Sequence, residues 1–123
     1  MDGICKPEGL AKRLKELQYR SAILTDHGSV SGCVKFHQYL TKNGLKPILG
    51  NEFYVSRQDS TIKDEFNRKL DHMVVVAKTK KTWQRLMQIT SLSNHPDNFY
   101  YKPRLNLEKL AQQLDKRFFV FTG

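Results

Sequence analysis

The chain has 123 residues, of which 39% are hydrophobic and 27% charged, a composition typical of a soluble segment about the size of one small domain. Lysine and arginine number 21 against 12 aspartates and glutamates, and the net charge of +9 indicates either a polyanionic partner such as nucleic acid or an ordinary solvated basic surface. The sequence has neither an apolar run of the ~20 residues that cross a bilayer nor the apolar core of a secretory signal, which excludes a membrane protein and predicts a cytoplasmic location.

The first part of the chain alternates helical and strand patterns. Pro7 suits a first helical turn, and three leucines follow it at helical spacing. The apolar run 22–24 predicts a strand, which ends in the polar turn 25–29. A second helical pattern spans 30–40, and the Asn-Gly pair at 43–44 is typical of a left-handed C-terminal cap.

The middle of the chain contains the clearest strand. Residues 47–50 lead into a second strand candidate at 53–55, and the polar stretch 56–70 is predicted to be an excursion or flexible loop. Residues 72–77 are apolar on both faces, as parallel strands between helices tend to be. A helix follows, and either Thr79 or Thr82 can cap it.

The last part of the chain continues the alternation. Apolar residues at helical spacing, Trp83 among them, predict a core-facing helix that ends before a loop over 93–106. A last helix is expected over 107–114 and a last strand over 118–121. Strands that alternate with helices of this length predict an α/β fold built from parallel strands, as one domain or part of one.

Polar residues stand at the ends of the predicted strands, where ligands gather in parallel α/β folds. His27 follows the first strand, Glu52 lies in the second, His72 opens the third, and Asp2 stands at the start of the chain. Imidazole nitrogen and carboxylate oxygen are donors that zinc, manganese and iron accept. The pattern therefore suggests a metal site; the alternative is an exposed histidine and a glutamate on a strand edge.

An aromatic and basic stretch lies in the predicted loop 93–106. Its residues Tyr100, Tyr101, Lys102 and Arg104 can stack on and neutralise a nucleic-acid strand. The alternative, which we favour, is that the aromatic rings pack onto the domain while the cations contact neighbouring domains of a larger protein.

Five further residues carry reactive or ionisable groups without an assigned site. Asp26 is expected to orient the turn or a helix terminus, and His37 and His95 to lie on the surface. The two cysteines, Cys5 and Cys33, form no CxxC pair, so we expect idle thiols and no disulfide framework or zinc knuckle.

Several separated motifs in the expected order resemble one known family. They include TDHG at 25–28, GNEFYV at 50–55, HMVVVAK at 72–78 and FYYKPR at 99–104. Together they resemble the PHP (polymerase and histidinol phosphatase) domain of bacterial-type DNA polymerase III alpha subunits. The FYYKPR stretch is similar to the polymerase branch of the family and not to the histidinol phosphatases.

This resemblance implies part of a distorted β/α barrel with a divalent-metal cluster, of zinc or manganese, at the carboxyl ends of its strands. By position, the family's ligands match Asp2, His27, Glu52 and His72. It also implies a parent protein that acts in DNA replication as a DNA-directed DNA polymerase, a nucleotidyltransferase. The metal site of such a domain is linked to 3′–5′ exonuclease activity. The implied partners are the remainder of the polymerase, DNA and an exonuclease subunit.

The chain departs from the family pattern at its ends. The first strand with its HxH motif is missing, and the ligands of the C-terminal part of the barrel are missing too. We therefore expect residues 1–123 to be a partial PHP domain whose metal site is incomplete and which is inactive alone. The alternatives are a stand-alone PHP phosphoesterase and a non-catalytic scaffold that binds an exonuclease subunit.

Overall fold

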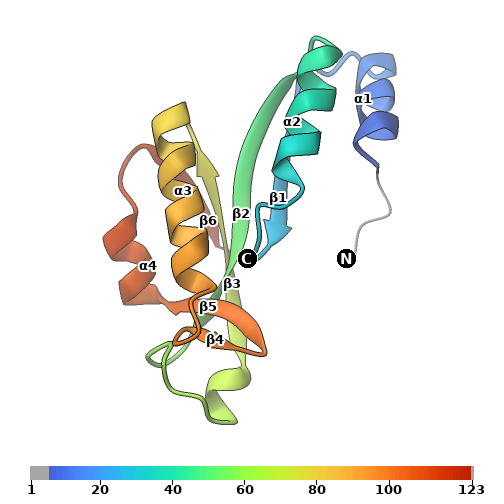
Figure 1. Cartoon of the computed structure of the whole chain (residues 1–123). Coiled ribbons are helices and arrows are strands. Elements are labelled where there is room, and N and C mark those ends of the chain that lie inside the picture. The colour runs from blue at the N-terminus through green and yellow to red at the C-terminus, as the bar shows by residue number, and fades with distance from the viewer. Residues whose placement is uncertain (1–5, 123) are drawn as a thin grey trace.

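A long central strand organises the structure, a computed structural model that describes residues 6–122 (Figure 1). In chain order the elements are α1 (Pro7–Glu16), β1 (Ser21–His27), α2 (Cys33–Lys42), β2 (Lys46–Ser56), the 3₁₀ helix η1 (Phe66–Arg68), β3 (Leu70–Ala77), α3 (Lys80–Ser93), β4 (Phe99–Tyr100), β5 (Lys102–Asn106), α4 (Leu107–Gln113) and β6 (Phe118–Thr122). The two segments predicted at 47–50 and 53–55 are therefore parts of one strand, β2.

The six strands form one mixed sheet around β2. On one edge of β2, β1 pairs in parallel with residues 46–52 and β5 pairs in parallel with residues 54–56. On the other edge β3 runs antiparallel to β2, and β6 runs antiparallel to β3. The short strand β4 forms a hairpin with β5, so the prediction of a loop throughout 93–106 was wrong.

The prediction of parallel strands throughout was wrong for β3. A parallel neighbour needs a crossover connection that returns the chain to the other end of the sheet. The connection between β2 and β3 carries only η1, so the chain turns back at the end where β2 finishes. The described residues form an open sheet, and closure into a barrel stays a prediction.

The helices bury one face of this sheet in two apolar clusters. The larger cluster joins Phe53 and Val75 of the sheet to Leu86 of α3 and Leu110 of α4. The smaller cluster joins α1 and α2 over β1 and the start of β2. The twist of the sheet separates the two helix pairs, which lie on either side of β2 in Figure 1.

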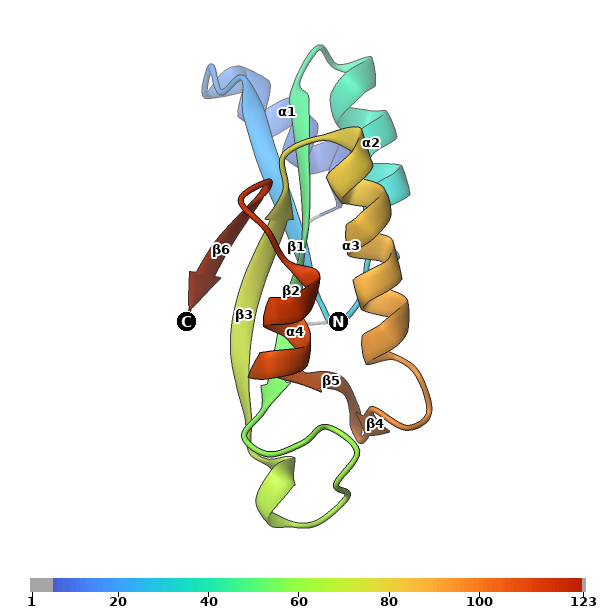
Figure 2. The same cartoon turned by 90° about the vertical axis from the view of Figure 1, so that its left-hand side faces the viewer.

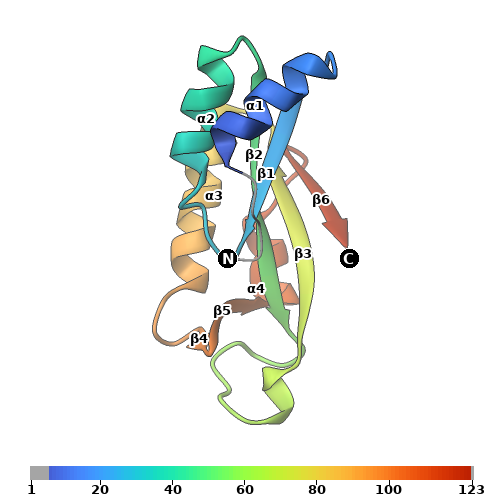
Figure 3. The same ribbon diagram turned by 90° about the vertical axis from the view of Figure 1, so that its right-hand side faces the viewer.

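The opposite face of the sheet carries the alternate residues of β2. Glu52 and Tyr54 lie on it, because successive side chains of a strand point to opposite faces. In the described part of the chain no helix covers this face, and Figure 3 shows β3 and β6 on the side away from α2 and α3. Phe119 and Phe121 of β6 are exposed there.

The ends of the helices follow the sequence signals. Thr79 and Thr82 form a reciprocal capping box at the start of α3, so both threonines take part. Gly44 adopts a positive φ after α2, as the Asn-Gly pair predicted. Asp26 accepts a hydrogen bond from the backbone N–H of Gly32, which confirms its predicted role at a helix terminus. Among the described helices none is long and apolar enough to span a bilayer.

The side chains around these helices match most of the predictions. His37 and His95 are exposed, and Trp83 packs against the larger cluster. Burial, with Asp26 nearby, raises the pKa of the Cys33 thiol to about 11, which disfavours its reactive thiolate form. Cys5 lies outside the described residues.

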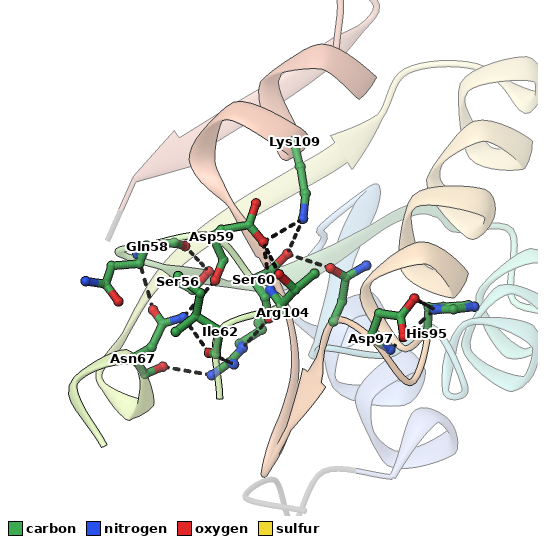
Figure 4. Close-up of polar contacts among 12 residues, drawn as sticks. Ser56, Gln58, Asp59, Ser60, Ile62, Asn67, His95, Asp97, Arg104 and Lys109 are labelled. Atoms are coloured by element: carbon green, nitrogen blue, oxygen red, sulfur yellow. Dashed lines mark hydrogen bonds and ion pairs between the residues drawn. The ribbon is translucent and has the colours of Figure 1, made fainter. Parts of the chain in front are cut away.

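The connection 57–69 is the predicted excursion and not the alternative of a flexible loop, because buried side chains hold its backbone in place (Figure 4). The buried guanidinium of Arg104 donates hydrogen bonds to three backbone carbonyls of this connection, those of Ser60, Ile62 and Asn67, at 2.7–3.2 Å. The buried Asn67 amide adds bonds to the carbonyls of Asp59 and Ile62. Backbone groups that water would otherwise satisfy are thus paired inside the protein.

Asp59 makes the stability of this connection depend on pH. Its carboxylate accepts hydrogen bonds from the Thr61 hydroxyl and backbone N–H, and pairs with Lys109 at 3.0 Å, which lowers its pKa to about 2. Because the folded pKa lies below the unfolded value of about 3.9, the contribution to stability is complete above that value and is lost as pH falls toward 2. The side chain is 44% exposed, so solvent screening limits the effect to less than about 1 kcal/mol.

We therefore expect Asp59→Asn to flatten the fall of the melting temperature between about pH 4 and pH 2, the window set by this lowered pKa. Thermal unfolding followed by circular dichroism at several pH values measures it. Asp97→Asn is the matched control, because Asp97 lies on the surface beside His95. An unchanged pH slope in Asp59→Asn would contradict the assignment.

Candidate metal centre

His27 and Glu52 face each other at the carboxyl end of β1. The parallel register pairs the two residues directly, and the distance from His27 Nδ1 to Glu52 Oε2 is 3.2 Å. The Glu52 side chain is 20% exposed and the His27 side chain 48% exposed. A half-buried carboxylate among apolar strand residues is costly unless it is paired, and this contact supplies a partner.

The turn after β1 holds His27 in this position. Gly28 follows with φ +61°, donates its N–H to the carbonyl of Glu52 at 2.8 Å and accepts a bond from the side chain of Asn94 at 3.1 Å. A Cβ at this position would lie 2.6 Å from Cγ of Pro103. Both the backbone conformation and the close contact therefore require glycine in the TDHG motif.

His72 lies on the same face of the sheet but outside this pair. It is opposite Tyr54 in the antiparallel register, with ring centroids 5.1 Å apart. Tyr54 is stacked on His27 from the other side at 6.3 Å. The start of β3 reaches this end of the sheet only because β3 runs antiparallel to β2.

Tyr54 is the residue of this region that the sequence prediction missed. Its ring lies between the two histidines, and the ammonium of Lys102 is 4.4 Å from the ring centroid. The available signal was the spacing, since Tyr54 lies two positions after Glu52 in a strand and so on the same face.

The His27–Glu52 pair fits two ligands of a divalent ion. Ligands about 2.0–2.1 Å from a tetrahedral zinc lie roughly 3.3 Å from each other, close to the observed contact. Among residues 6–122 there is no cluster of three or more His, Cys, Asp or Glu side chains that could hold a metal ion, so His72 does not complete the pair. Asp2, the fourth predicted ligand, lies outside the described residues.

The residues of the FYYKPR motif separate into exposed and buried positions. Tyr101 is 69% exposed with φ +60°, and Arg68 lies over its ring at 4.5 Å. Tyr100 is half-buried and contacts Tyr101 edge to face. Arg104 is fully buried, so its prediction as a nucleic-acid or interdomain contact was wrong, because its guanidinium is used inside the protein.

The fold has a counterpart among solved structures. The structure is similar to a solved structure from Bifidobacterium adolescentis described as a metal-dependent phosphoesterase, with a TM-score of 0.50 and 17% identity. The similarity covers 75% of this chain and 29% of that one. At this level of identity the likeness concerns the fold.

The chain belongs to the PHP domain family, whose profile matches residues 1–121. It is 36% identical to the DNA polymerase III subunit alpha of Helicobacter pylori over 112 residues, which cover 91% of this chain and 9% of that protein. It is 35% identical to the corresponding subunit of Aquifex aeolicus over 119 residues, covering 91% of this chain and 10% of that one. The chain thus spans about a tenth of the length of these relatives.

Proposed function

We propose that this chain is part of the PHP domain of a DNA polymerase III alpha subunit and acts in DNA replication. The similarity to such subunits extends over about nine tenths of the chain, which favours this function over a stand-alone phosphoesterase. In this proposal residues 1–123 are a partial domain, and the remainder of the polymerase supplies the rest of it. DNA and an exonuclease subunit are the further partners proposed for the parent protein.

The His27–Glu52 pair carries the chemical part of the proposal, a site for zinc or manganese. A divalent ion, when bound, supplies a polarised water and neutralises negative charge on a phosphodiester. The chain itself contributes His27 and Glu52 as ligands, oriented by the turn at Gly28. His72 and the Asp2 segment are the proposed neighbours of this pair in the intact domain.

Residues 6–122 bring too few ligands together for hydrolysis by a pair of metal ions. Such a mechanism needs two ions held a few ångströms apart by several carboxylates and histidines. Two adjacent donors offer one ion a weak site, because each missing ligand lowers the affinity. In this proposal hydrolysis needs the intact domain.

Calorimetric titration of the chain with zinc or manganese tests this assignment. We expect weak binding of at most one ion, and we expect His27→Ala to abolish it, because that change removes one of the two adjacent donors. His37→Ala is the matched control, since His37 is exposed on α2.

Two results would contradict different parts of the proposal. Tight stoichiometric binding of two or more ions would show that the chain alone completes the site. Equal binding by the wild-type chain and His27→Ala would place the metal elsewhere on the protein.

A further inference from the structure

A groove runs between α2 and α3 at the end of the sheet where β2 begins. Both helices lie over the same face of the sheet (Figures 2 and 3), on either side of β2 (Figure 1). The groove has a volume of about 950 Å³ and lies away from the metal ligands. Its lining comes from α2, the start of β2, the end of β3, the start of α3 and Phe119 of β6.

The floor of the groove is apolar and open to solvent. Leu49 of β2 and Trp83 of α3 line it on the helix side, Ile48 lines it from the opposite face beside the unpaired edge of β2, and all three are only partly buried. Val34 of α2 is 63% exposed on the helix side, and Phe119, which is 53% exposed, reaches the groove from the helix-free face. Exposed apolar residues grouped in this way mark interaction surfaces.

The start of β2 also offers an unpaired strand edge. The pairing of β3 with β2 stops at Gly50, opposite Val76. Residues 46–49 therefore have no strand beside them on that edge among the described residues. Backbone groups on such an edge are available to a bound segment.

Among the described residues, the lysines that line the rim of the groove are joined by no anionic side chain. Lys46, Lys78 and Lys80 line it, and no aspartate or glutamate does so within residues 6–122. Lys78 is held in place by a bond to the carbonyl of Lys116 and by the ring of Phe119, 4.1 Å from its ammonium. None of these three lysines forms an ion pair with the described carboxylates, so their charges are available to a partner.

We propose that this groove binds an acidic peptide segment of a partner protein, with apolar side chains on the floor and carboxylates against the three lysines. The apolar floor distinguishes this site from a nucleic-acid surface, which needs cations or aromatic platforms along a backbone track. An amphipathic segment in a groove buries its apolar face, while charge complementarity at the rim selects the partner. This inference is independent of the metal site.

Trp83 provides a direct measurement, because it is the single tryptophan of the chain and lines the groove. The probe is a synthetic peptide in which leucines and glutamates alternate, so that its extended form has one apolar and one acidic face and can pair with the edge of β2. We expect this peptide to shift the Trp83 emission to shorter wavelength, and added salt to weaken the binding. The same peptide with lysines in place of the glutamates is expected to leave the emission unchanged.

Charge-reversal variants of the rim lysines test whether the acidic peptide binds in this groove. The double variant Lys46→Glu with Lys80→Glu is expected to weaken binding of the acidic peptide about tenfold or more, because two rim cations become anions. Lys78 is left intact because it bonds to the neighbouring backbone. The control is Lys12→Glu with Lys69→Glu, which changes the net charge equally at exposed positions elsewhere.

A second variant tests the apolar floor. Val34→Asp is compatible with folding, since Val34 is exposed and an acidic residue is favourable in the first turn of a helix. This variant is expected to weaken the binding of the same peptide. Binding unaffected by both variants, equal binding of the lysine peptide, or no shift with any peptide overturns the proposal. So does a shift caused only by an oligothymidylate strand or only by raising the concentration of the chain itself, because those results assign the groove to nucleic acid or to a second copy.

Discussion

Arg104→Ala is expected to lower the free energy of unfolding by about 3 kcal/mol or more, the largest effect of any single substitution considered. The change removes one buried guanidinium that pairs three carbonyls of the connection 57–69. Each buried carbonyl left without a donor costs about 1–3 kcal/mol, and water that enters the space recovers part of this cost. Denaturation by urea, followed by circular dichroism, measures the loss.

Two controls separate the geometry of Arg104 from its charge. Arg104→Lys keeps the charge but cannot reach three separate acceptors, so we expect it to recover only a small part of the loss. Arg13→Ala removes an exposed arginine paired with Glu16 and is expected to cost less than about 1 kcal/mol. We also expect trypsin to cleave the connection 57–69 faster in Arg104→Ala. Wild-type stability and wild-type cleavage in that variant would show that the buried bonds do not hold the connection.

Gly50→Ala is expected to destabilise the protein by about 1–3 kcal/mol. Gly50 lies in the middle of β2, between β1 and β3, and a Cβ there would lie 2.7 Å from the carbonyl oxygen of Val75 and 2.8 Å from Cγ2 of Thr25. The contact at Val75 is with backbone, so it is relieved only by a shift of the strand pairing. The glycine of the GNEFYV motif is thus required by close packing in the sheet.

Gly9→Ala is the matched control for this prediction. The substitution is the same, but Gly9 lies within α1 and a Cβ there meets no atom within 4 Å. Alanine is the better helix former, so we expect this variant to be more stable by about 0.5–1 kcal/mol. The two variants should therefore move the melting temperature in opposite directions. Equal shifts would contradict the packing argument at Gly50.

Local patterns predicted the positions of most elements, because each depends on residues close together in sequence. The apolar run 72–77 and the helix that contains Trp83 are examples. The direction of β3 could not be predicted in this way. It depends on whether the connection 57–69 crosses the sheet, and the polar composition of that connection suits a loop of either kind.

The contact between His27 and Glu52 could likewise be predicted from the sequence, whereas the burial of Arg104 could not. The strand ends predicted that His27 and Glu52 lie near each other, and the register of β1 on β2 places them in contact. Arg104 stands in an aromatic and basic stretch typical of a surface. Its burial depends on carbonyls about forty residues away in the chain, which no local pattern indicates.

The strands β1 and β5 pair with the same edge of β2, but their separations from β2 along the chain differ. Paired residues of β1 and β2 are 25 positions apart, whereas paired residues of β2 and β5 are 50 positions apart. Closing the shorter loop costs less entropy, and during synthesis the residues of β1 and β2 are complete first. The contact between His27 and Glu52 can therefore form while the residues that anchor the connection 57–69 are still on the ribosome.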